Sequence, residues 1–98
     1  MTATSNSGAR NGNLLVTRVQ PTTSALLVLA ANPNRMKATI QNLSTSVTVF
    51  LAESSSVLST TGLELAAGAT LTDEETVTAY YGITASGTSD LRVAEVAS

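Results

Sequence analysis

The sequence contains no cysteine and no histidine in its 98 residues. Without cysteine the chain cannot form a disulfide framework, a thiolate nucleophile or a cysteine-ligated zinc site. Without histidine it lacks the usual general base near neutral pH and the commonest metal ligand. Serine is abundant, but no G-x-S-x-G or S-x-x-K pattern provides an activated one. We therefore predict a protein that is not an enzyme, with no catalytic residue, no metal site and no cofactor.

Charge is also scarce. Five basic and seven acidic residues give a net charge of −2, and 12% of the residues are charged, about half the usual share in globular proteins. Such a chain lacks the basic stripe that binding to phosphate groups requires, so we expect no nucleic-acid partner. No apolar run reaches the ~18 to 20 residues of a membrane span, and the polar N-terminal stretch lacks the apolar centre of a secretory signal. We expect a soluble protein with no export signal and no membrane partner.

Hydroxyl-bearing side chains take the place of charge. Ser and Thr account for 28 of the 98 residues, and 43% of the residues are hydrophobic. Disorder usually requires low hydrophobicity or high net charge, and this chain has neither. Thr and Val favour a pleated, half-buried surface. The composition therefore predicts a folded all-β domain with neutral, hydroxyl-rich outer faces.

From Asn13 onward, apolar residues recur with the two-residue period of β-strands. Turn signals such as Asn32-Pro33-Asn34 and Ser86–Asp90 separate seven or eight short segments of this kind. The pattern predicts a single small antiparallel β-sandwich or a jelly-roll-like barrel. We expect residues 13–98 to form that domain and the polar residues 1–12 to form a flexible, extended N-terminal arm.

Two segments carry expectations about which side chains face the core. In one strand, Met36, Ala38 and Ile40 share a face, which we expect to be the core face because the alternating residues are polar. A second, long strand is expected over residues 76–83, after the acidic turn Asp73-Glu74-Glu75.

That acidic turn is the only cluster of carboxylates. Hard cations such as calcium prefer carboxylate and carbonyl oxygens. Adjacent side chains in a strand point to opposite faces, so three in a row converge on one ion only if the backbone turns. We interpret the cluster as a solvated turn that blunts a strand edge, with a metal site as the alternative.

Some apolar side chains are expected to lie against another protein. The apolar run 25–31 predicts a strand covered on both faces, either inside the sandwich or by a second subunit. Phe50 points away from the core neighbour before it, toward a second packed layer or an interface. Tyr80 and Tyr81 must face opposite ways, so one is in the core and the other at the surface or an interface. In the arm, Arg10 is a lone cation suited to an acidic groove on another chain. Our interface candidates are Arg10, Leu26, Val28, Phe50 and Tyr80.

Several segments between Asn32 and Val96, about two thirds of the chain, carry a family resemblance. They are Asn32-Pro33-Asn34-Arg35, Thr39-Ile40-Gln41-Asn42, Val47-Thr48-Val49-Phe50, Gly62-Leu63-Glu64-Leu65 with Ala67-Gly68, Tyr80–Thr88 and Leu91–Glu95. In these segments the chain resembles small β-sandwich virion proteins of tailed bacteriophages, which include capsid decoration or cement proteins and parts of fibres or tails. The resemblance implies a β-sandwich that assembles on a virion, and it brings no catalytic motif.

The expected function follows from this resemblance and the composition. We expect a non-enzymatic decoration protein that binds the outer capsid surface and stabilises contacts between subunits of the major capsid protein. Its partners would be that protein and further copies of itself, in a symmetric homo-oligomer for which a trimer is favoured. It would be made in the host cytoplasm and end on the capsid surface of the virion. The alternatives are a fibre, neck or tail component, and a carbohydrate-binding module for host attachment, against which the 3% aromatic content argues.

Overall fold

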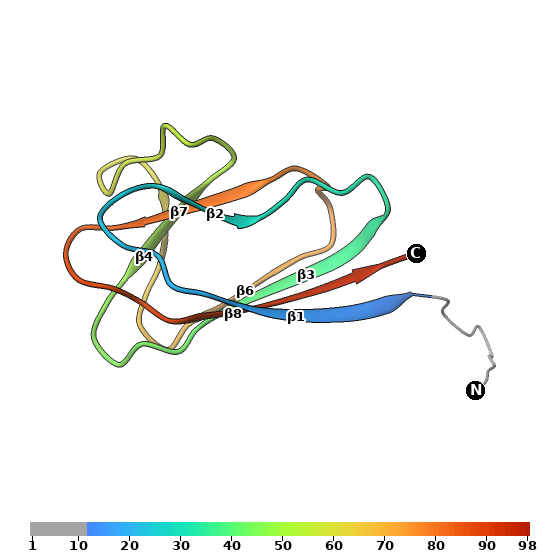
Figure 1. Cartoon of the computed structure of the whole chain (residues 1–98), viewed down its shortest axis with the longest axis horizontal. Coiled ribbons are helices and arrows are strands. Elements are labelled where there is room, and N and C mark those ends of the chain that lie inside the picture. Colours follow the sequence, from blue (N-terminus) through green and yellow to red (C-terminus); the bar gives the residue numbers. More distant parts are fainter. Residues whose placement is uncertain (1–11) are drawn as a thin grey trace.

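The computed structural model describes residues 12–98, which form eight strands and no helix (Figure 1). The strands are β1 (Asn13–Val19), β2 (Leu26–Leu29), β3 (Arg35–Asn42), β4 (Val49–Ala52), β5 (Leu63–Leu65), β6 (Thr70–Asp73), β7 (Tyr80–Thr84) and β8 (Leu91–Ala97). Residues 1–11, and with them the interface candidate Arg10, lie outside the described residues.

The strands form two four-stranded antiparallel sheets. The first sheet has the order β1-β8-β3-β6, and the second has the order β2-β7-β4-β5. The β4–β5 hairpin stays within one sheet. Every other connection between consecutive strands crosses from one sheet to the other. Two interleaved four-stranded sheets with this order make an eight-stranded jelly roll. The prediction of an all-β sandwich is confirmed, and the strand order selects the jelly-roll form.

The core lies between the two sheets and follows from the alternation of side chains along each strand. Ile40, Leu91 and Val93 enter it from the first sheet, and Val49 and Leu51 enter it from the second. Each of these five is at most 2% exposed. Their neighbours along each strand point outward, which explains the two-residue period in the sequence.

Side chains of this core approach the backbone closely at Gly82. A Cβ added there would lie 2.9 Å from a Val28 methyl and 3.2 Å from a Val49 methyl. We expect Gly82→Val to destabilise the domain by about 1–3 kcal/mol, because the extra methyl groups force neighbours out of well-packed positions. Urea unfolding followed by circular dichroism measures the change. Ala94→Val, on the outer face of β8, is the control and should shift stability by less than about 0.5 kcal/mol; equal losses from both variants would contradict this packing.

The strand β7 begins at Tyr80, four residues later than expected. In the segment before Tyr80, carbonyl oxygens that would accept hydrogen bonds from a neighbouring strand accept them from other groups instead. Arg35 Nη1 donates to the Thr78 oxygen at 2.8 Å, and the Asn32 amide donates to the Val77 oxygen at 2.9 Å. The segment before Tyr80 is therefore held as an irregular connection.

The apolar run 25–31 differs from its expectation. Only Leu26–Leu29 is a strand, and it lies at the edge of the second sheet instead of the middle. Val28 is buried at 4% exposure, but Leu26 and Leu27 are 40% and 45% exposed. The fold itself therefore does not cover this run on both faces.

The expectation for Met36 is wrong. The pairing of β3 with β8 shifts register between Arg35 and Lys37. The shift turns Arg35 inward and brings Met36 to the outer face, where its sulfur and Val96 both approach Gly12. Ala38 and Ile40 are in the core as expected, at 1% exposure each. A single bulge thus replaces an apolar side chain on the inner face with a guanidinium group.

Candidate functional site

Two apolar surfaces lie outside the core, and the first belongs to β1. Leu14, Leu15 and Val16, which we call the β1 surface, are 67%, 60% and 55% exposed. The strand sits at the margin of its sheet beside β8, which is its only partner among the described residues (Figure 1). A long, exposed, apolar edge strand is a template for pairing with another chain.

The side chains of the β1 surface divide between the two faces of the sheet. Leu14 and Val16 pair with Val96 and Ala94 on the outer face. Leu15 pairs with Glu95 on the inner face of the sheet, which is the face that other residues of β8 present to the core. The edge strand therefore exposes apolar side chains on both faces of the sheet. If the fold itself covered this strand, these side chains would be buried.

The second surface is the outer face of the other sheet. We call Leu27, Phe50, Ala52, Tyr81 and Ile83 the β7 face, because they alternate with inward residues on three paired strands. Tyr81 lies between Leu27 and Ala52, and Ile83 pairs with Phe50. Leu27 is exposed and the other four are half-buried. This face combines two aromatic rings with aliphatic side chains, a composition enriched in protein interfaces.

Phe50 has cover on one side. A Cβ added to Gly62 would lie 2.8 Å from the Phe50 Cβ and 3.0 Å from a Val57 methyl. Val57, in the loop between β4 and β5, is only 4% exposed. The loop therefore supplies a small second packed layer beside Phe50, and the rest of the β7 face stays open.

The interface candidates from the sequence are distributed over different environments. Val28 belongs to the core, so its side chain offers no surface to a partner. Tyr80 packs against the core and its hydroxyl donates to Asp73 at 2.6 Å, which leaves Tyr81 as the outward ring. Phe50 lies on the β7 face. Leu26 pairs with Gly82, so it lies on the opposite face of β2 from Leu27, where it is 40% exposed. The sequence analysis named Tyr80 as the interface candidate of the two tyrosines, whereas Tyr81 is the outward one. It omitted the β1 surface, although the consecutive Leu14-Leu15-Val16 signalled apolar character on both faces.

Asp73 organises the acidic turn. Its Oδ1 accepts from the Glu75 amide at 2.8 Å and the Thr76 amide at 3.1 Å, while its Oδ2 accepts from the hydroxyls of Thr76 and Tyr80. The hydrogen bond from the Thr76 hydroxyl, followed by that from Tyr80, holds the pKa of Asp73 well below its usual range. Burial, and then the hydrogen bond to Asp73, raises the pKa of Tyr80. The carboxylate is thus occupied within the fold.

This arrangement predicts an acid-sensitive contribution to stability. A lowered folded pKa stabilises the protein above the unfolded value of about 3.9, and the contribution is lost as the pH falls through the folded pKa. We expect Asp73→Asn to cost about 1–2 kcal/mol near neutral pH, by loss of charge-assisted hydrogen bonds, and progressively less below the unfolded pKa. Urea unfolding at several pH values measures this. The exposed neighbour variant Glu74→Gln is the control, and a cost for Asp73→Asn that is independent of pH would contradict the mechanism.

Open hollows lie on either side of this turn. One of about 380 Å³ and one of about 410 Å³ share Leu63, Thr76 and Tyr80 in their lining. In these linings, Asp73, Thr76 and Tyr80 are engaged in the hydrogen bonds of the turn. Within residues 12–98, no three acidic, histidine or cysteine side chains gather where they could hold a metal ion.

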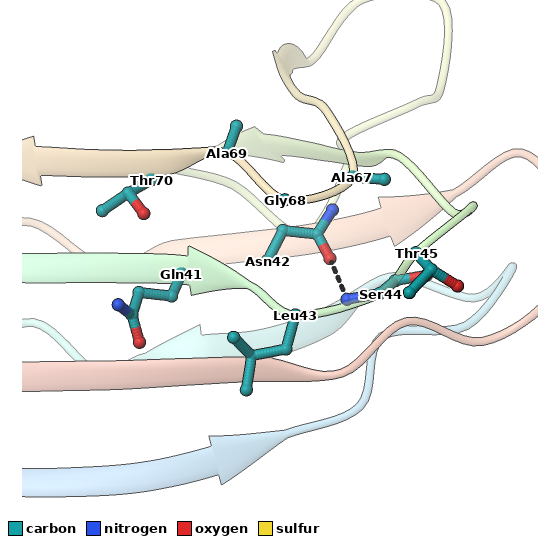
Figure 2. A pocket seen from close by; sticks show the side chains of 9 residues that line it. All are labelled: Gln41, Asn42, Leu43, Ser44, Thr45, Ala67, Gly68, Ala69 and Thr70. Atoms are coloured by element: carbon teal, nitrogen blue, oxygen red, sulfur yellow. Dashed lines mark hydrogen bonds between the residues drawn. The ribbon is translucent and has the colours of Figure 1, made fainter.

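Another hollow, of about 440 Å³, lies at the opposite end of the sandwich, around Asn42 (Figure 2). Asn42 is 1% exposed. Its amide nitrogen donates to the carbonyl oxygens of Val47 at 2.9 Å and Leu65 at 3.0 Å. Its amide oxygen accepts from the Ser44 amide at 3.1 Å, as Figure 2 shows, and from the Ser89 hydroxyl at 2.6 Å. Asn42 therefore ties three loops together and is a structural group.

Arg35 plays the same part at the end near Asp73. Its side chain is fully buried, and Nε donates to Glu95 at 2.9 Å. Nη2 donates to the Ala30 oxygen at 2.6 Å, in addition to the Nη1 bond to Thr78. No buried side-chain nitrogen or oxygen of the described residues lacks a hydrogen-bond partner. The buried polar groups are thus committed to holding the two sheets together, and the two apolar surfaces are our candidates for contact with other proteins.

Comparisons with family models, with curated proteins and with solved structures find no match to this chain. The described residues also form no helix long and apolar enough to cross a bilayer. The assignment of a function therefore depends on the fold and on the two apolar surfaces.

Proposed function

We propose that this chain is a non-enzymatic structural protein of a tailed-bacteriophage virion, and specifically a decoration protein of the capsid. It binds the outer capsid surface and strengthens contacts between subunits of the major capsid protein. The observation that carries the proposal is the pair of apolar surfaces on the outside of a small sandwich whose buried polar groups are all engaged. A surface of this kind serves contact with other proteins.

The β7 face is the surface we assign to the capsid. Tyr81 and Phe50 stand on paired strands of a rigid sheet, flanked by Leu27 and Ile83. Aromatic side chains at the centre of an interface carry a large share of its binding energy. A rigid sheet loses little conformational entropy when it binds, so a modest area suffices for each copy.

Composition and architecture support the same conclusion. A net charge of −2 leaves little repulsion between identical copies that stand close together on a shell. Jelly rolls are common in viral capsid proteins, and this likeness is an analogy at the level of the fold. The resemblance of segments between Asn32 and Val96 to small virion proteins of tailed bacteriophages, which include decoration proteins and parts of fibres or tails, agrees with both arguments.

The experiment adds purified protein to capsids from which it has been removed. We expect bound protein and a rise in the melting temperature of the capsid, because a ligand that binds only the assembled state stabilises it. Absence of binding, or binding without a rise in melting temperature, would contradict the decoration role.

A substitution on the β7 face sharpens this test. Tyr81→Ala removes a ring at the proposed centre and should weaken capsid binding by about 2 kcal/mol or more, roughly thirty-fold in dissociation constant. Thr39→Ala, on the outer face of the other sheet, is the matched control and should bind as the unchanged protein does. If both variants bind equally, the β7 face is not the capsid contact.

A further inference from the structure

We propose that the β1 surface is a dimer interface, in which the β1 strands of two copies pair edge to edge and antiparallel. A twofold axis normal to the sheet would relate the copies and join their first sheets into one eight-stranded sheet. This contact goes beyond capsid binding and does not depend on it. It replaces the threefold arrangement expected from the sequence with a twofold one.

The free edge is long enough for such pairing. All seven residues of β1 pair with β8 on one side. On the other side, no backbone group of Asn13–Val19 bonds to another described segment. An added strand would satisfy these groups by main-chain hydrogen bonds, as in other cases of strand addition.

The order of residues in β1 selects one register. With Leu15 opposite Leu15 of the second copy, Leu14 faces Val16 on the outer side of the sheet. Asn13 then faces Thr17, so apolar residues meet apolar ones and polar residues meet polar ones. A register centred on Val16 would place Leu14 opposite Arg18, and one centred on Leu14 would place Leu15 opposite Asn13. Only the Leu15 register matches every position of the β1 surface, and matched cross-strand pairs stabilise a sheet.

The same register separates the charges near the edge. The two Arg18 side chains would be six residues apart along the joined strands, about 20 Å at the usual rise per residue. This exceeds the screening length of about 8 Å at physiological ionic strength. Each Arg18 also retains its partner in its own copy, since its Nε donates to Asp90 at 2.9 Å.

A second copy fits this edge better than the N-terminal segment does. Residues 1–11 contain no leucine, isoleucine, valine or aromatic residue. That segment cannot match Leu14, Leu15 and Val16 with comparable apolar side chains, whereas a second β1 matches all three. In this register five residues of each β1 strand, Asn13–Thr17, face one another. Pairing over this length falls at or below the lower end of specific interfaces, about 1,200 Å² in total. We therefore expect a dimer that forms at micromolar concentration and dissociates on dilution.

The association of the full chain is measured as its molar mass, by sedimentation or light scattering, at concentrations from micromolar to millimolar. We expect the molar mass to rise from monomer to dimer. Leu15→Lys and Leu15→Glu should each remain monomeric, because like charges would face each other, and their equimolar mixture should regain the dimer. Leu58→Lys, which changes a leucine that is 55% exposed in a loop, is the control and should dimerise normally.

Cysteine substitutions test the register, since the chain has no other cysteine. Leu15→Cys should cross-link two copies under mild oxidation, because residues directly opposite lie within disulfide reach. Thr17→Cys should not, because the two introduced groups would be about 13 Å apart. A monomer at all concentrations, a dimer that survives Leu15→Lys, or equal cross-linking of both cysteine variants would overturn the proposal. So would loss of the dimer when residues 2–11 are deleted, because the N-terminal segment would then be the occupant.

Discussion

Replacing Arg35 with alanine is expected to destabilise the domain by about 3–5 kcal/mol, the usual cost of breaking a buried ion pair from one side. The guanidinium group is fully buried and holds Glu95, which is itself only 13% exposed. It also donates to the carbonyl oxygens of Ala30 and Thr78. The alanine variant leaves a carboxylate and two carbonyl oxygens without their partner. Because small domains have only about 5–15 kcal/mol of stability, this loss is a large share of the total.

Urea unfolding followed by circular dichroism measures this loss. Arg35→Lys should lose much of the same stability, because an ammonium group cannot donate in the three fixed directions of the guanidinium. Arg92→Ala is the control, because its contact with Asp90 at 2.7 Å is on the surface and such pairs contribute at most about 1 kcal/mol. If Arg35→Ala costs no more than Arg92→Ala, Arg35 does not hold the sheets together.

Asn42→Ala should have an effect of similar size, about 3–5 kcal/mol, from unpaired buried groups together with the space left by the amide. The variant leaves the carbonyl oxygens of Val47 and Leu65 and the hydroxyl of Ser89 without their bonds. Three loops at one end of the sandwich would lose their common anchor. The exposed neighbour Gln41→Ala is the matched control and should be close to neutral.

Asn42→Asp separates the hydrogen bonds from the packing. The introduced carboxyl keeps the size of the amide but would face the oxygens of Val47 and Leu65 as an acceptor. Burial against two carbonyl oxygens raises the pKa of such a group, so its cost is greatest at high pH and is relieved as the pH falls below the folded pKa. A loss of stability that is the same across the acid range would show that hydrogen bonding at this position is not the cause.

The sequence allowed the strands and the fold class to be predicted because both depend on local pattern. Alternation of Ala38 and Ile40 with polar residues, and turns such as Asn32-Pro33-Asn34, are readable without knowledge of the partners of each strand. The role of Arg35 was not readable. It follows an apparently exposed turn, and its acceptors lie on distant parts of the chain at Thr78 and Glu95. The late start of β7 has the same non-local cause.

The candidate surfaces could be predicted only in part. Whether a strand with Leu14-Leu15-Val16 is central or marginal is decided by the sheet order, which depends on long-range pairing. Which of Tyr80 and Tyr81 faces outward depends on a one-residue register. The hydrogen bond from the Tyr80 hydroxyl to Asp73 agrees with an inward position of Tyr80. The sequence pattern does not predict this bond, because it does not specify how the two elements that carry these residues are placed relative to each other.

The most direct test of the decoration role is the number of copies of this chain in purified virions, measured by quantitative mass spectrometry against the major capsid protein. The account predicts a copy number of the same order as that of the major capsid protein, since a decoration protein repeats across the shell. A few copies in each particle would instead indicate a fibre, neck or tail component, and absence of the chain from the particle would contradict a structural role in the virion.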